Sequence, residues 1–184
     1  MRQLYLVRHA SPQIQPSEPA RDWPLSERGI TEAQTLAGTA ADWGIEALYS
    51  SSEAKARATA LIIGDALGLP VRVADAFDEL RMSDWISNAD EFNETVQAIL
   101  EGEAPPRGAE SRDDAAARFA DGVALVAAAT MPAAIVSHGR ILTAYLAKHR
   151  PLESPFDYWR AIPMPAWTTI DLDAPRDPPL PFSP

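Results

Sequence analysis

The stretch Leu4-Tyr5-Leu6-Val7-Arg8-His9-Ala10, near the N-terminus, decides the fold. Its four leading apolar residues predict a short strand that ends at Arg8 and His9. The same pattern returns about 130 residues later, where Ala134-Ile135-Val136 leads into Ser137-His138-Gly139. In an open α/β sheet, strand ends along one edge meet at a crevice where ligands bind. We therefore expect an α/β fold whose sheet brings His9 and His138 together.

Strands and helices alternate along the rest of the chain, which is typical of a sheet with helices on both faces. Apolar residues at helical spacing predict helices, and short apolar runs bounded by turn residues predict strands. The expected helices are 26–44, 53–67, 90–100, 112–129 and 139–148, and the expected strands are 4–7, 47–49, 71–73, 133–136 and 167–172. We expect a three-layer α/β/α sandwich with a mostly parallel central sheet.

The length of 184 residues fits one domain, and no internal repeat divides it. We expect this domain to span residues 1–173. From Ala174 onward, five prolines in eleven residues predict a Pro-rich C-terminal tail. Such a tail is either an extended surface strap or disordered.

The composition excludes several classes of protein. The absence of cysteine excludes a disulfide framework, a zinc–thiolate site and an iron–sulfur cluster, and no other residue cluster suggests a metal site. A net charge of −10 argues against a nucleic-acid partner. No apolar run approaches the length of a membrane span, and the N-terminus lacks the apolar core of a signal peptide. We therefore expect a cytoplasmic protein without a membrane partner; its oligomeric state stays open.

Several segments, in a fixed order along nearly the whole chain, resemble the histidine phosphatase superfamily, the fold of phosphoglycerate mutase and its relatives. The segments are Arg8-His9-Ala10, Pro24-Leu25-Ser26-Glu27-Arg28-Gly29, Ser50-Ser51, Phe77-Asp78-Glu79-Leu80, Gly108-Ala109-Glu110-Ser111 with Arg118 after it, and Ser137-His138-Gly139. The resemblance implies a phosphatase that hydrolyses a small phosphate monoester without a metal or nucleotide cofactor.

The resemblance also assigns roles to the residues at the two strand ends. His9 would attack phosphorus and become phosphohistidine, which water then hydrolyses; an imidazole with a pKa near 6.5 is a nucleophile at neutral pH. The planar fork of Arg8 suits two phosphate oxygens. His138 would donate a hydrogen bond to a phosphoryl oxygen. Gly139 would let the backbone approach the same oxygens at a helix start.

Glu79 is the implied proton donor for the leaving group. Phe77, Leu80 and Trp85 lie beside it in the sequence, so we expect desolvation to raise its pKa. Asp78 is the competing donor, and Arg81 is near enough either to oppose this increase or to contact the substrate.

The polar loop after His9 supplies two further candidates. We expect Ser11 and Gln15 as phosphate contacts, with Gln15 standing where many family members have asparagine. Trp23, Trp85, Phe156 and Trp159 are candidates for an organic leaving-group pocket, or for ordinary packing.

Two positions depart from the family pattern. Ala10 replaces a glycine, which is a mild change. The anchors Ala56 and Thr59-Ala60 put Lys55, not Arg57, at the position of the phosphate-binding arginine. Residues two apart on a helix point about 200° apart, so only one of them faces the site. Lysine keeps the charge but loses the bidentate fork.

Two other functions remain open. A phosphoglycerate-type mutase uses the same fold, although the short, acidic segment 75–106 favours a phosphatase. Lysine at the arginine position also allows a catalytically weak protein that binds phosphoesters or phosphoproteins. An assay with p-nitrophenyl phosphate separates enzyme from binder.

Overall fold

A five-stranded sheet forms the centre of the molecule, as the computed structural model shows for residues 2–83, 86–149, 152–174 and 181–184. The strands lie in the order β3-β2-β4-β1-β5. Among these five described strands, only β1 and β5 pair antiparallel. Their bounds are β1 Gln3–Arg8, β2 Ala47–Ser50, β3 Val71–Val73, β4 Ala133–Ser137 and β5 Ala166–Asp171.

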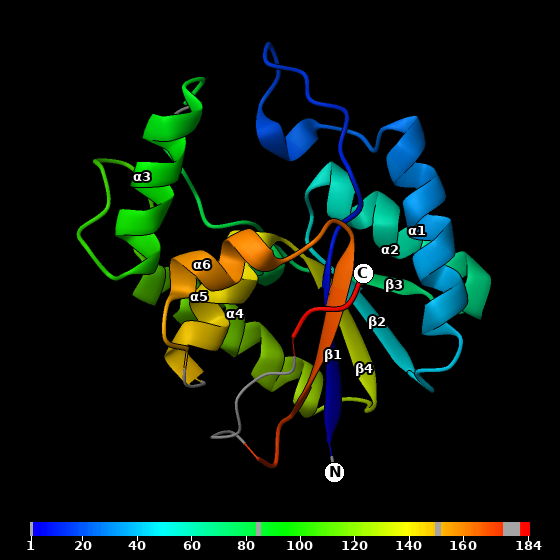
Figure 1. Cartoon of the computed structure of the whole chain (residues 1–184). Coiled ribbons are helices and arrows are strands. Elements are labelled where there is room, and N and C mark those ends of the chain that lie inside the picture. The colour runs from blue at the N-terminus through cyan, green and yellow to red at the C-terminus, as the bar shows by residue number, and fades with distance from the viewer. Residues whose placement is uncertain (1, 84–85, 150–151, 175–180) are drawn as a thin grey trace.

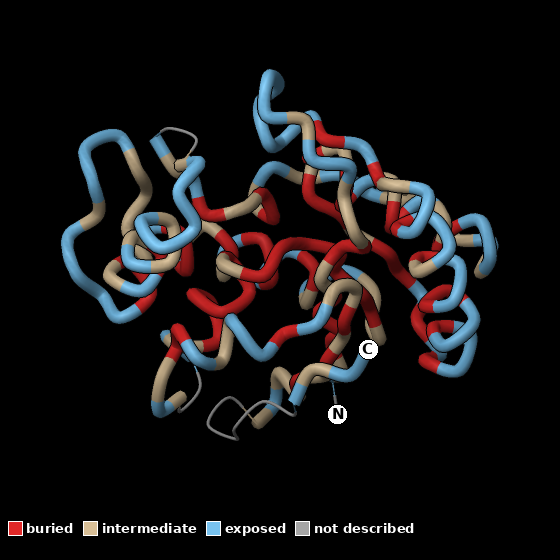
Figure 2. The backbone as a smooth tube through the Cα atoms, turned by 45° about the horizontal axis from the view of Figure 1, so that its top comes forward, coloured by how far each residue is buried: buried red, intermediate tan, exposed pale blue. Residues whose placement is uncertain are grey.

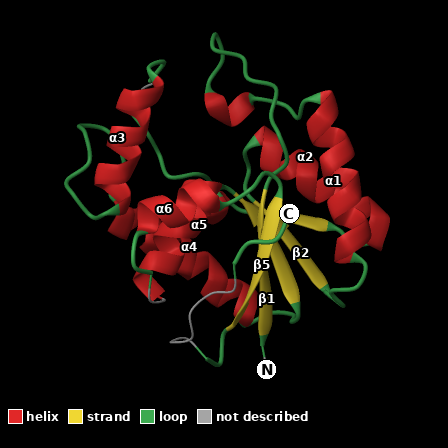
Figure 3. Ribbon diagram, viewed as in Figure 1, coloured by secondary structure: helices red, strands yellow, loops and turns green. Residues whose placement is uncertain are grey.

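Helices cover both faces of this sheet (Figures 1 and 3). One face carries α1 and α2, and the other carries α3, α4, α5 and α6. The bounds are α1 Glu27–Ala40, α2 Ala54–Leu67, α3 Ala89–Leu100, α4 Arg112–Ala127, α5 Gly139–His149 and α6 Pro155–Ala161. The expected three-layer sandwich with its mostly parallel sheet is thus confirmed.

The apolar run of β1 is buried on both sides, because successive residues of a strand point to opposite faces. Leu4 and Leu6 join the core beneath α4 and α5, while Tyr5 and Val7 join the core beneath α1 and α2. Figure 2 shows buried backbone through the centre of the molecule and exposed backbone around it. A strand covered by helices on both faces needs this continuous apolar sequence.

The structure adds one helix that we expected to be loop. Helix α6 lies within residues 151–165. It is only seven residues long, too short for its apolar residues to show a helical repeat. Ser154 caps it by accepting a hydrogen bond from the Asp157 N–H, and Pro155 takes its first position. Proline fits there because the first helical N–H has no partner within the helix. Single 3-10 turns also occupy Ala20–Asp22 (η1) and Asp75–Phe77 (η2).

The end of the tail lies against the outer strand of the sheet. Ser183 exchanges two backbone hydrogen bonds of 2.8 Å with Trp167 of β5, and the Phe182 ring contacts Tyr158. Residues 181–184 therefore pack against β5, whereas residues 175–180 lie outside the described part. None of the described helices has the length and apolar character needed to cross a membrane.

Candidate active site

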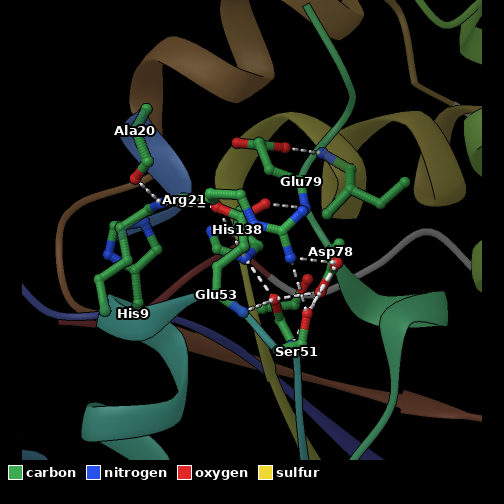
Figure 4. A network of polar contacts seen from close by, with 12 residues as sticks. His9, Ala20, Arg21, Ser51, Glu53, Asp78, Glu79 and His138 are labelled. Carbon is green, nitrogen blue, oxygen red and sulfur yellow. Dashed lines mark hydrogen bonds and ion pairs between the residues drawn. The ribbon is translucent and has the colours of Figure 1, made fainter. Parts of the chain in front are cut away.

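The register between β1 and β4 places the two histidines side by side. Arg8 lies opposite Ser137, and the His9 N–H donates to the Ser137 carbonyl at 3.0 Å. Because the strands are parallel, both chains leave the sheet at the same edge. The ring centroids of His9 and His138 are 5.0 Å apart, with their planes at 64°, and both residues are buried. Figure 4 shows them among side chains from several elements.

The hydrogen bonding of His9 defines its protonation. Its Nδ1 lies 2.8 Å from the Ala10 carbonyl, which can only accept, so Nδ1 carries the proton. Burial and the neighbouring His138 hold the pKa of His9 well below its usual value. The ring is therefore neutral at pH 7 and carries its lone pair on Nε2. The Ala10 N–H donates to Thr59 Oγ1 of α2 at 3.1 Å, which fixes the turn after β1.

The tautomer of His138 follows from its neighbour Ser51. Ser51 Oγ donates its one hydrogen to Asp78 Oδ1 at 2.8 Å. His138 Nε2 lies 2.8 Å from Ser51 Oγ, whose hydrogen is already used, so Nε2 must donate to Oγ. Burial lowers the pKa of His138 to about 3, so its Nδ1 is unprotonated at pH 7. We expected His138 to donate to a phosphoryl oxygen, but here its only N–H is directed to Ser51.

Glu53, which the sequence did not single out, contacts three site residues. Its Oε2 lies 2.6 Å from Lys55 Nζ and 3.8 Å from His138 Nε2, and its Oε1 accepts from the Glu79 N–H at 2.9 Å. It is the residue before α2 and makes no side-chain cap there. It belongs to none of the segments that carry the family resemblance, so no motif pointed to it.

Lys55 is turned inward, whereas Arg57 is exposed. This orientation agrees with the register that the family anchors Ala56 and Thr59-Ala60 implied. The Lys55 ammonium group donates to Glu53 and to the Ala20 carbonyl at 2.8 Å. Its charge is thus already balanced by an internal carboxylate.

The expected increase in the pKa of Glu79 is wrong. Burial raises this pKa, but Arg140, His138 and the N–H groups of Leu80 and Ile141 outweigh burial and lower it to about 2. Arg140 Nε lies 3.2 Å from Glu79 Oε2, and the Ile141 N–H donates to Oε1 at 2.9 Å. Glu79 therefore sits as a carboxylate at the start of α5, where helix N–H groups favour a negative charge.

Residues 77–81, the loop that carries Glu79, are called the acid loop below. Some of the other expectations about this loop agree with the structure and others do not. Phe77 and Leu80 are buried near Glu79 as expected, while Trp85 lies outside the described residues. The cation paired with Glu79 is Arg140 rather than Arg81, whose side chain is exposed. Asp78 accepts from Ser51 and from the N–H and hydroxyl of Ser52, so its oxygens are occupied by these donors.

Arg118 of α4 fixes the backbone of the acid loop by hydrogen bonds. Its Nη1 donates to the carbonyls of Ala76 and Asp78, each at 3.0 Å. Its Nη2 donates to the Glu79 carbonyl at 3.3 Å. Glu110 fixes Arg118 in turn, with 2.8 Å between Glu110 Oε2 and Arg118 Nη2. This explains why the Gly-Ala-Glu-Ser segment and the later arginine occur together in the sequence.

Two guanidinium groups at the site have buried N–H donors with no hydrogen-bond partner among the described residues: Arg8 through Nε and Arg140 through Nη1. Arg8 is anchored by its Nη1, which donates to the Ile162 carbonyl. Gly139 allows this packing, since a Cβ there would lie 3.2 Å from Arg8 Nε and 3.0 Å from Trp159 Nε1. Unsatisfied buried donors are uncommon and often mark the place of a ligand.

The loop residues Ser11 and Gln15, expected as phosphate contacts, make hydrogen bonds to α1 and within the loop. Ser11 N–H donates to Glu32 Oε2 at 3.1 Å, and its carbonyl accepts from Ser26, so it fixes the start of α1. The Gln15 carbonyl accepts from the Trp23 indole at 2.8 Å. Within the described ranges, neither makes a hydrogen bond to His9 or His138.

The aromatic candidates divide between packing and the site. Trp23 and Phe156 are buried in the loop and in the core, respectively. Trp159 stands beside Gly139, at the site. No three His, Asp or Glu side chains in the part of the chain that the structure describes form a group able to hold a metal ion.

Comparison with known proteins adds a family to this geometry. The chain matches the histidine phosphatase superfamily (branch 1) over residues 4–176. None of the curated proteins matches it.

Solved structures share the fold. A mycobacterial glucosyl-3-phosphoglycerate phosphatase is 27% identical, with a TM-score of 0.70, and the match covers 91% of this chain and 89% of that one. A protein described as mycobacterial hydrolase 1 is also 27% identical, with a TM-score of 0.76 over 91% of this chain and 90% of that one. YhfR from Bacillus stearothermophilus is 23% identical, with a TM-score of 0.76 over 98% and 94% of the two chains.

Proposed function

Because the chain belongs to the histidine phosphatase superfamily, as its sequence resemblance predicted, we propose that it hydrolyses a phosphate monoester through a phosphohistidine formed on His9. One observation carries the proposal. The contact between Nδ1 and the Ala10 carbonyl leaves the lone pair of a buried, neutral imidazole on Nε2. Monoester hydrolysis is among the slowest uncatalysed reactions, and a covalent intermediate divides it into two easier steps.

In the first step, His9 Nε2 attacks phosphorus while the bond from phosphorus to the ester oxygen breaks. The leaving oxygen takes a proton and departs as an alcohol. In the second step, water attacks phosphorus, the bond from phosphorus to nitrogen breaks, and inorganic phosphate leaves. The lone pair returns to Nε2, so the protein ends the cycle unchanged.

The proton for the leaving oxygen needs a separate explanation, because Glu79 is ionised in the ligand-free protein. A phosphoryl group beside Glu79 places two negative groups together, which raises the pKa of one of them. We propose that the substrate enters as its monoanion, whose pKa is near 6. Its proton passes to Glu79 and then to the leaving oxygen.

The substrate in this proposal is a small phosphorylated molecule, neither a nucleic acid nor a membrane lipid, and we place the protein in the cytoplasm. The likeness to a glucosyl-3-phosphoglycerate phosphatase makes phosphorylated sugar acids the first compounds to assay. Sugar phosphates, nucleotides, phosphoglycerates and phosphohistidine peptides complete the panel. Interconversion of phosphoglycerates without phosphate release would instead indicate the mutase.

The test compares wild type with His9→Ala on p-nitrophenyl phosphate. We expect turnover by the wild type and none by His9→Ala. Quenching the wild type without acid should trap a phosphoryl group that is labile in acid and stable in base. Substantial turnover by a folded His9→Ala protein would refute the assignment.

The ion pair between Lys55 and Glu53 favours a second candidate, a phosphoester-binding protein with weak catalysis. The cation at the family's arginine position is already neutralised by a carboxylate 2.6 Å away. Saturable binding of inorganic phosphate without turnover of any panel compound would identify this function.

A further inference from the structure

Arg140 lies at the centre of the site although no motif named it. It is the second residue of α5 and follows His138 and Gly139 directly. Its Nε lies 3.2 Å from Glu79 Oε2, and its side chain is largely buried. Its backbone N–H, 3.4 Å from the same oxygen, holds the carboxylate from a second direction.

An aromatic ring restricts the Arg140 guanidinium. The group lies 5.6 Å above the centre of the Phe92 ring of α3. Phe92 in turn packs against Trp159, with ring centres 6.2 Å apart. A guanidinium held over a ring and tied through Nε has a defined plane, so the direction of its remaining N–H donors is set before any ligand binds.

One further donor of Arg140, on Nη1, is available to a ligand. Its Nη1 is buried and has no partner in the described part of the chain, and the same holds for Arg8 Nε. A buried donor without a partner costs about 1–3 kcal/mol, more when the group is charged. Burial lowers the pKa of Arg8, Glu79 opposes this effect, and the charge of Arg140 lowers the pKa further. An anion bound between the two guanidinium groups would satisfy both donors and relieve their repulsion.

Lysine replaces the phosphate-binding arginine of the family pattern in this chain. Lys55 stands at the arginine position, lacks the planar fork, and donates to Glu53 and Ala20. Arg140 has both the fork and a buried donor without a partner among the described residues, and its charge acts on Arg8, Glu79 and His138.

We propose that Arg140 supplies the guanidinium contact to the phosphoryl group that Lys55 cannot make, with Nη1 on a phosphoryl oxygen and Nε still on Glu79. This inference rests on the proposed function and deepens it. Arg140 then bridges the two negative groups, so that substrate and Glu79 can occupy the site together.

The test measures binding of inorganic phosphate to the whole protein by titration calorimetry. Arg140→Gln should weaken binding about 10- to 150-fold, the range for one charge-assisted hydrogen bond. Arg140→Lys, which keeps the charge and loses the fork, should give an intermediate loss. Arg72→Gln is the matched control, because Arg72 also stacks on a ring, 5.5 Å above Tyr49, but is exposed at β3. It should bind phosphate like the wild type.

A second background separates binding from positioning. If Arg140 contacts the phosphoryl group, Arg140→Gln also weakens phosphate binding when Glu79→Gln is already present. If Arg140 only positions Glu79, the two changes together bind phosphate as Glu79→Gln does, and the inference is wrong. Should Arg140→Gln not fold by circular dichroism, Arg140→Lys decides, and an affinity equal to wild type overturns the proposal.

The outcome for the proposed function is separate. A wild type that hydrolyses p-nitrophenyl phosphate while Arg140→Gln binds phosphate normally removes the role of Arg140 and leaves the phosphatase standing. A wild type that neither binds phosphate nor turns over any ester overturns both.

Discussion

Glu53 neutralises Lys55 inside the site: Oε2 of the carboxylate and Nζ of the ammonium are 2.6 Å apart, and both side chains are about nine-tenths buried. A lysine buried without such a partner would lose its charge or destabilise the fold. The pair therefore explains how the chain tolerates lysine at this depth. Under the proposed function, an incoming phosphoryl group would compete with Glu53 for the same cation.

Glu53→Gln should strengthen the binding of phosphate and weaken the fold. Glutamine keeps the shape and the acceptor for the Glu79 N–H, but it no longer balances Lys55. Two unit charges about 4–6 Å apart repel by about 3–4 kcal/mol at an effective dielectric near 20, so removing the charge of Glu53 should raise phosphate affinity about 100- to 1,000-fold. Breaking a buried pair costs about 3–5 kcal/mol. Calorimetry and urea unfolding check both effects, and phosphate should restore part of the lost stability. Unchanged affinity would show that Glu53 does not compete with the anion.

Lys55→Ala should weaken phosphate binding about 10- to 150-fold, because the site loses a cation and exposes the ligand to Glu53. Arg57→Ala is the control, since Arg57 points to solvent on the same helix. A severe loss in Arg57→Ala with Lys55→Ala near wild type would show that the arginine position has been assigned to the wrong residue.

Glu79→Gln should slow esters of poor leaving groups far more than aryl esters. An alkoxide needs its proton at the transition state, and general acid catalysis is worth about 10²- to 10⁴-fold, whereas an aryl oxide needs little help. The measurement compares kcat for an alkyl phosphate with kcat for p-nitrophenyl phosphate. Equal losses on both esters would favour Asp78 as donor or a binding role for Glu79.

The stability of the fold should decrease as the pH falls below 6.5. His138 has a pKa of about 3 when folded, and the pKa of His9 is also well below its usual value. Between these values and 6.5 the unfolded chain binds protons that the folded chain does not, so unfolding is favoured by acid. Each histidine contributes a slope of about 1.4 kcal/mol per pH unit.

Urea unfolding between pH 7 and pH 5 tests this dependence. His138→Gln should remove about half of the slope, whatever its effect on stability at pH 7. His149→Gln, the same change at an exposed histidine of α5, is the matched control. An unchanged slope in His138→Gln would mean that His138 is protonated in the folded protein near pH 6.

Local sequence was sufficient for the frame of the site. The apolar runs of β1 and β4 predicted two neighbouring strands, and parallel pairing then required their histidines to meet. The family anchors Ala56 and Thr59-Ala60 implied that Lys55, and not Arg57, faces inward, and helix geometry allows only one of the two to do so. These features depend on one element and its immediate ends.

The ion pair between Arg140 and Glu79 could not be predicted from the sequence, because it joins segments far apart in the chain. Glu79 had several cations within plausible distance, and only the docking of α5 selects Arg140 over Arg81. The same choice reverses the sign of the pKa shift, since a paired carboxylate behaves oppositely to one surrounded by apolar residues. Helix α6 was missed for another reason: seven residues are too few to show a period.

Gly139→Ala should lower kcat and have little effect on the free energy of unfolding. The added Cβ would lie 3.0 Å from Trp159 Nε1 and 3.2 Å from Arg8 Nε, closer than most real contacts of this kind, so one of the two side chains must shift. A shift of Arg8 misplaces a proposed phosphate ligand, and an error of about 1 Å costs roughly 100-fold in rate.

Gly38→Ala is the matched control, because a Cβ there meets nothing within 4 Å in α1 and should stabilise the helix by about 0.5–1 kcal/mol. Trp159→Phe removes the indole N–H that the new methyl group would touch. If Trp159 alone yields, Gly139→Ala with Trp159→Phe regains the turnover of Trp159→Phe; if Arg8 yields, the loss persists. Full activity in Gly139→Ala would show that the site does not depend on this close approach.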